Sequence, residues 1–164
     1  MGVKPIGIIY NTNLVKKGEI GSFLDLLKPE WKEKIISSDP RVELNAIGDM
    51  HILVEQWGLD KAKEYFSYLV KEHKAVVTRD QYQSTEWVAR GKYPIALAPR
   101  PDEIQGFQQI GLPIIMPSAP TEGIHLVTGS GGIALINQAP HPNAAKLFIN
   151  WLLSKEGLTI YSKV

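Results

Sequence analysis

The sequence contains no cysteine among its 164 residues. This absence excludes disulfide bonds, metal sites built from thiolates and enzymes with a cysteine nucleophile. No apolar run approaches the roughly 20 residues that a membrane-spanning helix needs, and no signal peptide opens the chain. An excess of one charge is also lacking, because 18 scattered lysine and arginine residues balance 17 acidic ones. The sequence therefore gives no electrostatic reason to expect binding to nucleic acid or to an anionic membrane.

What the sequence does contain is an alternation of strand-like and helix-like segments. Short apolar runs followed by turn formers predict strands, and apolar residues at three- and four-residue spacing predict helices. The expected strands cover residues 6–10, 34–36, 75–77, 94–97, 113–116 and 124–128, and the expected helices cover 43–57, 59–73, 81–90 and 103–110. This alternation predicts an α/β fold with a mainly parallel sheet flanked by helices.

The stretch 131–155 combines three local signals. Residues 133–136 form a short apolar run, which predicts a strand that is buried on both faces. Pro142 suits the first position of a helix, where a missing N–H costs little. Beyond it, Phe148 and Trp151 fall on one helical face. The sequence here predicts a buried strand, a proline-rich turn and an amphipathic helix.

Four stretches together resemble one family of proteins. They are, in chain order, IGIIYNTN, LLKPEWKEKIISSDPR, WVARGKYPIALAP and GGIALINQAPHPNAAKLFINWLLSKEG. They are similar to segments of the extracytoplasmic (periplasmic) solute-binding proteins of ABC importers, in the ferric-iron-binding-like group with the type 2 periplasmic-binding fold. The resemblance covers nearly the whole chain and is specific at the level of the family.

The resemblance implies a protein of two lobes and about twice this length, so we expect the chain to be a fragment. Residues 1–128 would form the second-lobe α/β domain, with the hinge strand at its start. Residues 129–164 would form a strand-turn-helix segment that returns to the first lobe. The implied function is capture of a solute by hinge closure, in the periplasm or another extracytoplasmic space, and its delivery to an ABC permease. The alternative is a natural single-domain protein that shares these motifs.

Charged residues follow three of the predicted strands, each just before a predicted helix. They are Asp39 and Arg41, then Arg79 and Asp80, then Arg100. In open α/β sheets, ligands bind at the carboxyl ends of the strands, where helix N-termini also point. If the sheet brings these ends together, the arginines would favour a small organic anion, because guanidinium groups offer paired planar donors. Tyr10 and Asn11, at the end of the hinge strand, are two further candidate ligand contacts.

A second interpretation of the same arginines is structural. Acidic residues lie close to them in the sequence, namely Asp39, Asp80 and Asp102. Each arginine could pair with one of these carboxylates and fix a surface loop, a contact that contributes little to affinity for any ligand. The sequence leaves both interpretations open.

No cofactor and no metal ion is expected. Ferric-binding members of the family present a tyrosine pair after the strand predicted here at 94–97, whereas this chain has Pro99-Arg100-Pro101 there and no adjacent tyrosines. Residues 129–134 match the letters of a dinucleotide fingerprint, but they precede a predicted strand instead of a helix. His51 and Glu55 have a spacing that metals use, but no second pair completes a site.

These patterns predict binding and no enzyme activity. The rival interpretations are a small α/β hydrolase or transferase that uses Asp39 or Asp80 as acid or base, and a module that only contacts a partner protein. A fragment with one side of the cleft is expected to bind solute weakly by itself. It would leave Phe148 and Trp151 without their usual partner surface, which predicts a homodimer, with exchange of the last helix as one route.

Overall fold

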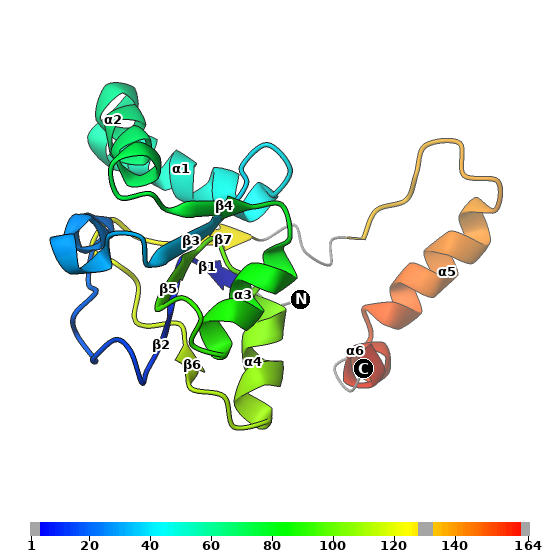
Figure 1. Cartoon of the computed structure of the whole chain (residues 1–164). Helices are drawn as coiled ribbons and strands as arrows, with labels where there is room; N and C mark the ends of the chain where they lie inside the picture. Colours follow the sequence, from blue (N-terminus) through cyan, green and yellow to red (C-terminus); the bar gives the residue numbers. More distant parts are fainter. Residues whose placement is uncertain (1–3, 128–132, 162–164) are drawn as a thin grey trace. The chain divides into compact units, whose positions relative to one another are not determined.

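The computed structural model describes residues 4–127 and 133–161, and the chain divides into two compact units. The unit Val3–Val127 contains the strands and four α-helices, and the other unit contains the two C-terminal helices (Figure 1). The strands are β1 (Lys4–Ile6), β2 (Ile8–Asn11), β3 (Ile35–Ser38), β4 (Val76–Thr78), β5 (Ile95–Leu97), β6 (Ile114–Ile115) and β7 (His125–Val127). The α-helices are α1 (Leu44–Trp57), α2 (Leu59–Lys71), α3 (Gln81–Ala89), α4 (Pro101–Gln109), α5 (Pro142–Leu152) and α6 (Lys155–Tyr161). Among the residues that the structure describes, every helix is too short or too polar to span a lipid bilayer.

Five strands form the main sheet, in the order β4-β3-β5-β2-β6. β3 is parallel to both β4 and β5, while β2 runs antiparallel to its two neighbours β5 and β6. Four strands therefore share one direction and only β2 opposes them. The expected α/β fold with a mainly parallel sheet is confirmed, with β2 as its exception.

The alternation of side chains along the strands supplies two separate cores. Ile8 and Tyr10 of β2 and Ile35 of β3 pack against α1 and α2 on one face of the sheet. Ile9 and Ile36 pack against α3 and α4 on the other face. Figure 1 shows the two helix pairs on opposite sides of the sheet. Burial on both faces explains why these strands are apolar runs without a polar side.

The hinge strand expected at 6–10 is two strands in the structure, separated at Gly7. β2 joins the main sheet, whereas β1 pairs antiparallel with β7 in a separate two-stranded sheet, with Lys4 opposite Val127. The apolar pattern extends across both strands, so it could not show that the chain changes sheets at the glycine.

The C-terminal unit confirms the expected helix from Pro142 but not the strand expected at 133–136. These four residues have no regular secondary structure, and Ile136 is 79% exposed. The prediction was wrong because a strand needs hydrogen-bonded neighbours. Among the described residues of this unit there is no other strand with which it could pair.

Candidate functional site

The parallel strands β4, β3 and β5 bring their carboxyl ends to one edge of the sheet. The turns that follow them carry the charged residues singled out in the sequence. A cleft of about 550 Å³ opens at this edge. Its lining residues are Glu43, Arg79, Asp80, Gln81, Tyr82 and Arg100. Two of the three candidate arginines and one candidate aspartate therefore line one cleft.

Both arginines of the cleft are largely open to solvent. The side chain of Arg79 is 74% exposed and that of Arg100 is 54% exposed. Arg79 Nε lies 3.6 Å from Asp39 Oδ2, and Arg100 Nε lies 3.7 Å from Glu103 Oε1. Exposed ion pairs at such distances are weak, so both guanidinium groups can exchange these contacts for a ligand.

Arg41, the third candidate, has a different role in the structure. Its backbone N–H donates to Asp39 Oδ1 at 2.9 Å, and its Nη2 donates to Asp39 Oδ2 at 2.7 Å. Hydrogen bonds from Arg41 hold the pKa of the Asp39 carboxyl well below its usual range, with Arg79 adding a smaller electrostatic effect. Arg41 thus matches the structural interpretation, in which an arginine fixes a loop by pairing with an aspartate.

Three helices, α1, α3 and α4, begin around the cleft. The N-terminal end of a helix favours negative charge because of the helix dipole. Asp80 caps α3 by accepting a hydrogen bond from the Gln83 N–H at 2.9 Å. The N-cap residues of α1 and α4, Glu43 and Arg100, form no capping hydrogen bond with their side chains. The cleft therefore combines two guanidinium groups with the N-terminal ends of three helices.

Tyr10 and Asn11 are not at this edge, contrary to the sequence expectation. Tyr10 pairs with Ile95 at the amino end of β5, so it lies at the edge of the sheet opposite Arg100. Tyr10 and Asn11 are each 2% exposed. The Asn11 side chain donates to the carbonyl oxygen of Val88 at 2.8 Å, which fixes the end of α3. A ligand in the cleft cannot reach these two side chains in this structure.

Three lining residues are absent from the set of site residues predicted from the sequence. Glu43 and Gln81 were assigned only to helix starts, and Tyr82 was only a possible further contact. The signal that could have identified them was their position, because each lies within two residues of a helix start at the carboxyl edge. The ring centroids of Tyr82 and Phe107 lie 5.8 Å apart, and Tyr82 is 43% exposed.

The structure offers few groups for a metal ion. Within residues 4–127 and 133–161, no cluster of three or more histidine, aspartate or glutamate side chains could hold one. His51 Nε2 and Glu55 Oε1 lie 3.7 Å apart, and both side chains are 66% exposed on α1. The glycines at 129–132, which begin the apparent dinucleotide fingerprint, lie outside the described residues.

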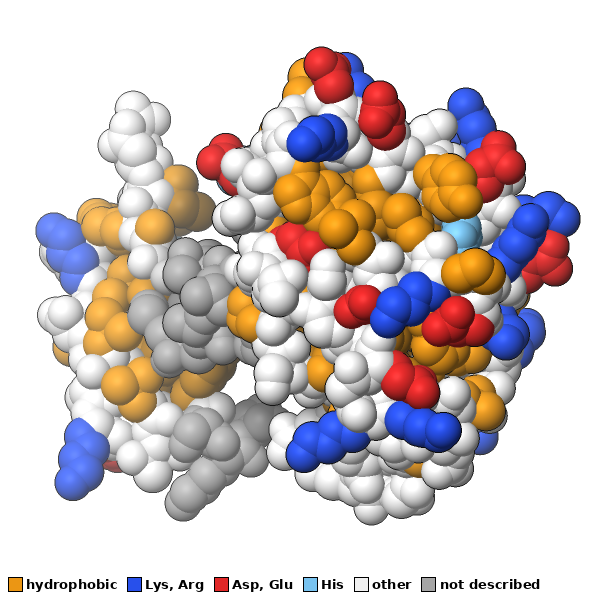
Figure 2. Space-filling model, turned by 90° about the vertical axis from the view of Figure 1, so that its left-hand side faces the viewer, with side chains coloured by type: hydrophobic (Ala, Val, Ile, Leu, Met, Phe, Trp, Pro, Cys, Tyr) orange, Lys and Arg blue, Asp and Glu red, His pale blue; other side chains and the backbone are white. Residues whose placement is uncertain are grey.

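The molecule as a whole carries little net charge. On the face of the molecule drawn in Figure 2, acidic and basic side chains are interspersed, with hydrophobic side chains between them. The net charge of the sequence is +1. Any preference of the cleft for an anion must therefore come from its own arginines and helix ends, and not from a field of the whole molecule.

Comparison with known proteins matches residues 1–159 to the family model described as bacterial extracellular solute-binding protein. A protein of Haemophilus influenzae, described as uncharacterized, is 29% identical over 136 residues, which cover 81% of this chain and 37% of that protein. The periplasmic binding protein AfuA from Actinobacillus pleuropneumoniae, with exogenous fructose-6-phosphate bound, is 27% identical. Its TM-score is 0.73, and the match covers 94% of this chain and 48% of that chain.

Iron-bound HitA from Pseudomonas aeruginosa has a TM-score of 0.74, over 96% of this chain and 51% of that chain. Its identity of 16% supports a common fold alone. The chain thus spans about half the length of these solved structures and 37% of the Haemophilus protein.

Proposed function

This chain belongs to the family of bacterial extracellular solute-binding proteins, and from that premise we propose that it contributes one side of a site that captures a small organic anion. In the whole protein, two lobes close on the solute by hinge bending. The closed protein then delivers the solute to an ABC permease. We place this activity in the periplasm or another extracytoplasmic space.

The observation that carries the proposal is the shared cleft of Arg79 and Arg100. Arginine donates pairs of parallel hydrogen bonds to carboxylate and phosphate groups. The starts of α1, α3 and α4 lie beside these guanidinium groups, and helix N-termini favour anions. Glu43 and Asp80 also line the cleft, and their carboxylates can accept hydrogen bonds from hydroxyl groups of a solute.

The same cleft argues against iron as the solute. Its two guanidinium groups offset the carboxylates of Glu43 and Asp80, and Asp80 already caps α3. The lining residues include one tyrosine, Tyr82, where ferric-binding members of the family present a pair. The resemblance to iron-bound HitA concerns the fold. AfuA, which is more similar in sequence, has a sugar phosphate bound, and this relative supports an anionic organic solute.

The surroundings of Asp39 and Asp80 favour a function in binding over one in catalysis. A general acid or base must exchange protons near the working pH. Asp39 is held in its ionised form by Arg41, and Asp80 caps α3. An enzyme that uses either residue remains the rival function. Conversion of an ester or a phosphate ester by the purified protein, detected by mass spectrometry, would favour that rival.

A thermal-shift screen with matched variants tests the proposal. The probes are inorganic phosphate, small carboxylates, phosphonates and sulfonates, each compared with a neutral analogue. Anions are expected to raise the melting temperature of the unaltered chain, and Arg79→Gln and Arg100→Gln should each reduce this increase. Arg90→Gln is the matched control, because Arg90 caps the C-terminal end of α3, away from the cleft at the start of that helix. Arg90 is also exposed (60%) and pairs with a glutamate.

Equal responses of all three variants would contradict the proposal. The affinity of this chain is expected to be weak, with a Kd on the order of 1 mM, because one lobe supplies only part of the contacts. Submicromolar binding in calorimetry would contradict the idea that the cleft is one side of a larger site.

We also propose that the chain by itself forms a homodimer through α5. No residue of α5 is buried, and Leu147, Phe148 and Trp151 are 73%, 54% and 40% exposed. The ring centroids of Phe148 and Trp151 lie 5.9 Å apart, so the two side chains form one apolar patch. Exposed patches of this kind promote association.

A further inference from the structure

The turn that presents Arg100 to the cleft is held by side chains from three other elements. The groups that hold it are Ser38 from β3, Asn45 from α1, and Gln81 and Thr85 from α3. Ser38 Oγ donates to the Ala98 carbonyl oxygen at 2.9 Å, and Asn45 Nδ2 donates to the Pro99 carbonyl oxygen at 3.0 Å. The Arg100 N–H donates to Thr85 Oγ1 at 3.2 Å. The backbone of residues 98–100 therefore depends on its surroundings for its conformation.

Ala98 shows why the turn needs this support. Its φ angle is +52°, in the left-handed region that residues with a Cβ rarely adopt. Such a conformation persists only where surrounding contacts fix it, and functional sites are one place where it occurs. Ala98 lies two residues before Arg100, so its conformation determines the direction in which the Arg100 side chain leaves the turn.

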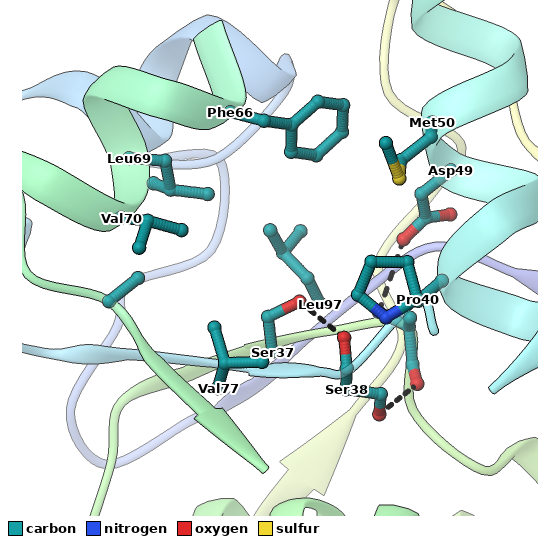
Figure 3. Close-up of a pocket in the computed structure, with 13 residues that line it drawn as sticks. Ser37, Ser38, Pro40, Asp49, Met50, Phe66, Leu69, Val70, Val77 and Leu97 are labelled. Carbon is teal, nitrogen blue, oxygen red and sulfur yellow. Dashed lines mark hydrogen bonds between the residues drawn. The ribbon is translucent and has the colours of Figure 1, made fainter. Parts of the chain in front are cut away.

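The N–H of Ala98 donates to a buried carboxyl group. Asp49 Oδ2 accepts this hydrogen bond at 3.1 Å, and Asp49 is 2% exposed. Figure 3 shows Asp49 and Met50 on α1 facing Phe66, Leu69 and Val70 of α2 across a cavity of about 100 Å³. Burial raises the pKa of Asp49 to about 7. A carboxyl in such apolar surroundings is costly, and an apolar side chain would fit them better.

The cost of this carboxyl needs a compensating role, and the Ala98 N–H supplies one. We propose that Asp49 is a positioning residue for anion capture, which acts from behind the turn and fixes the direction of Arg100 through the Ala98 amide. This inference rests on the proposed function, because it concerns the same cleft. It adds a residue that is not among the lining residues of the cleft and that lines a separate cavity.

Two substitutions at Asp49 separate positioning from stability. Asp49→Asn keeps an oxygen that can accept the Ala98 hydrogen bond, so it is expected to retain the phosphate affinity of the unaltered chain. Asp49→Leu has a similar branched shape and adjoins the cavity, but it leaves the Ala98 N–H without an acceptor. It is expected to weaken phosphate binding about tenfold, which corresponds to one lost hydrogen bond. The melting temperature of Asp49→Leu at pH 8 should be equal to or above that of the unaltered chain, because the substitution removes a carboxyl that is costly to bury.

The measurement is an NMR titration of the ¹⁵N-labelled chain with inorganic phosphate, with hydrogen exchange of the Ala98 amide as a second readout. Exchange should accelerate in Asp49→Leu and remain slow in Asp49→Asn. Leu53→Ala is the matched control, because Leu53 is a fully buried residue of the same helix that packs in the core. It should lower the melting temperature and leave the phosphate affinity unchanged.

The outcomes distinguish this inference from the proposed function. If Arg100→Gln weakens phosphate binding and Asp49→Leu does not, the positioning role is overturned and the proposed function stands. If Asp49→Asn loses as much affinity as Asp49→Leu, the hydrogen bond is not the cause and the inference is also overturned. If Arg79→Gln and Arg100→Gln leave phosphate binding unchanged, the proposed function fails and the inference fails with it.

Discussion

Arg41 and Arg79 are identical residue types at the same edge of the sheet, yet their surroundings give them different roles. Asp39 forms close hydrogen bonds with Arg41 but lies 3.6 Å from Arg79 Nε, which lines the cleft. The sequence placed both residues after strands and therefore predicted a common edge. It could not predict which arginine is neutralised, because that depends on a local turn in which Asp39 also accepts the Arg41 N–H.

The low pKa of Asp39 predicts a loss of stability in acid. A carboxyl with a lowered pKa contributes stability above its unfolded pKa of 3.8, and this contribution is lost as the pH falls through its folded pKa. Asp39→Asn should therefore be less stable than the unaltered chain at pH 7, and the difference should shrink below about pH 4. Urea unfolding at pH 7 and at a pH well below 4 measures how this difference in stability changes. A gap of constant size would contradict the role assigned to Asp39.

Asp49 predicts the opposite dependence. Its pKa is raised by burial from 3.8 to about 7, so the folded chain holds a proton that the unfolded chain releases. This contribution is complete below pH 3.8 and is lost as the pH rises through 7, by at most about 4 kcal/mol. Tyr65 of α2 interacts with Asp49, but its own pKa is raised well above its ordinary value by burial, so it does not titrate in this range.

Asp49→Asn removes this titration. Its free energy of unfolding should gain on that of the unaltered chain between pH 5 and pH 8. The two values are compared by urea unfolding at each pH. A difference that does not change with pH would show that Asp49 ionises at its ordinary pKa.

At the scale of the elements, the sequence predicted most of what the structure contains. The helix from Gln81 ends where the sequence placed its end, because Gly91 adopts a φ of +77° that favours glycine. The segment 133–136 was wrongly predicted as a strand, because strand pairing depends on partners that a local pattern does not reveal. The edge shared by three strand ends could be anticipated, but the burial of Tyr10 could not, because it follows from the direction of β2.

The 3₁₀ helix Phe23–Leu27 provides a test at this scale. Ser22 caps it by accepting the Leu24 N–H at 3.0 Å, while its own N–H donates to Asp25 Oδ2 at 3.0 Å. The Ser22 hydroxyl also donates to Glu122, a residue that is 8% exposed. Ser22→Ala should reduce the free energy of unfolding by about 1–2 kcal/mol, measured in urea. Ser67→Ala, at an exposed position of α2, is the control and should change stability by less than about 0.5 kcal/mol.

At the scale of the whole molecule, the two units present different problems of burial. The unit Val3–Val127 has cores on both faces of its sheet, whereas α5 in the other unit has no buried residue. The proposed dimer would cover the apolar side chains of α5. This chain spans about half of the solved structures to which it is similar.

Light scattering at high protein concentration tests the dimer. The unaltered chain should show twice the monomer mass, and the double substitution Phe148→Ser, Trp151→Ser should return it to the monomer mass, because the apolar patch is removed. Ile110→Ser is the control, because Ile110 is 69% exposed at the end of α4 and should have no effect. A monomeric mass for the unaltered chain would contradict the proposal.

The central claim is that an anion binds at the carboxyl edge of the sheet, between Arg79 and Arg100. Chemical-shift mapping of the ¹⁵N-labelled chain during titration with inorganic phosphate tests it most directly. The account predicts saturable shifts at the backbone amides of Arg79, Gln81 and Arg100, with none at Asn11 on the opposite edge. Saturable shifts that are absent from these amides and appear elsewhere on the molecule would contradict it.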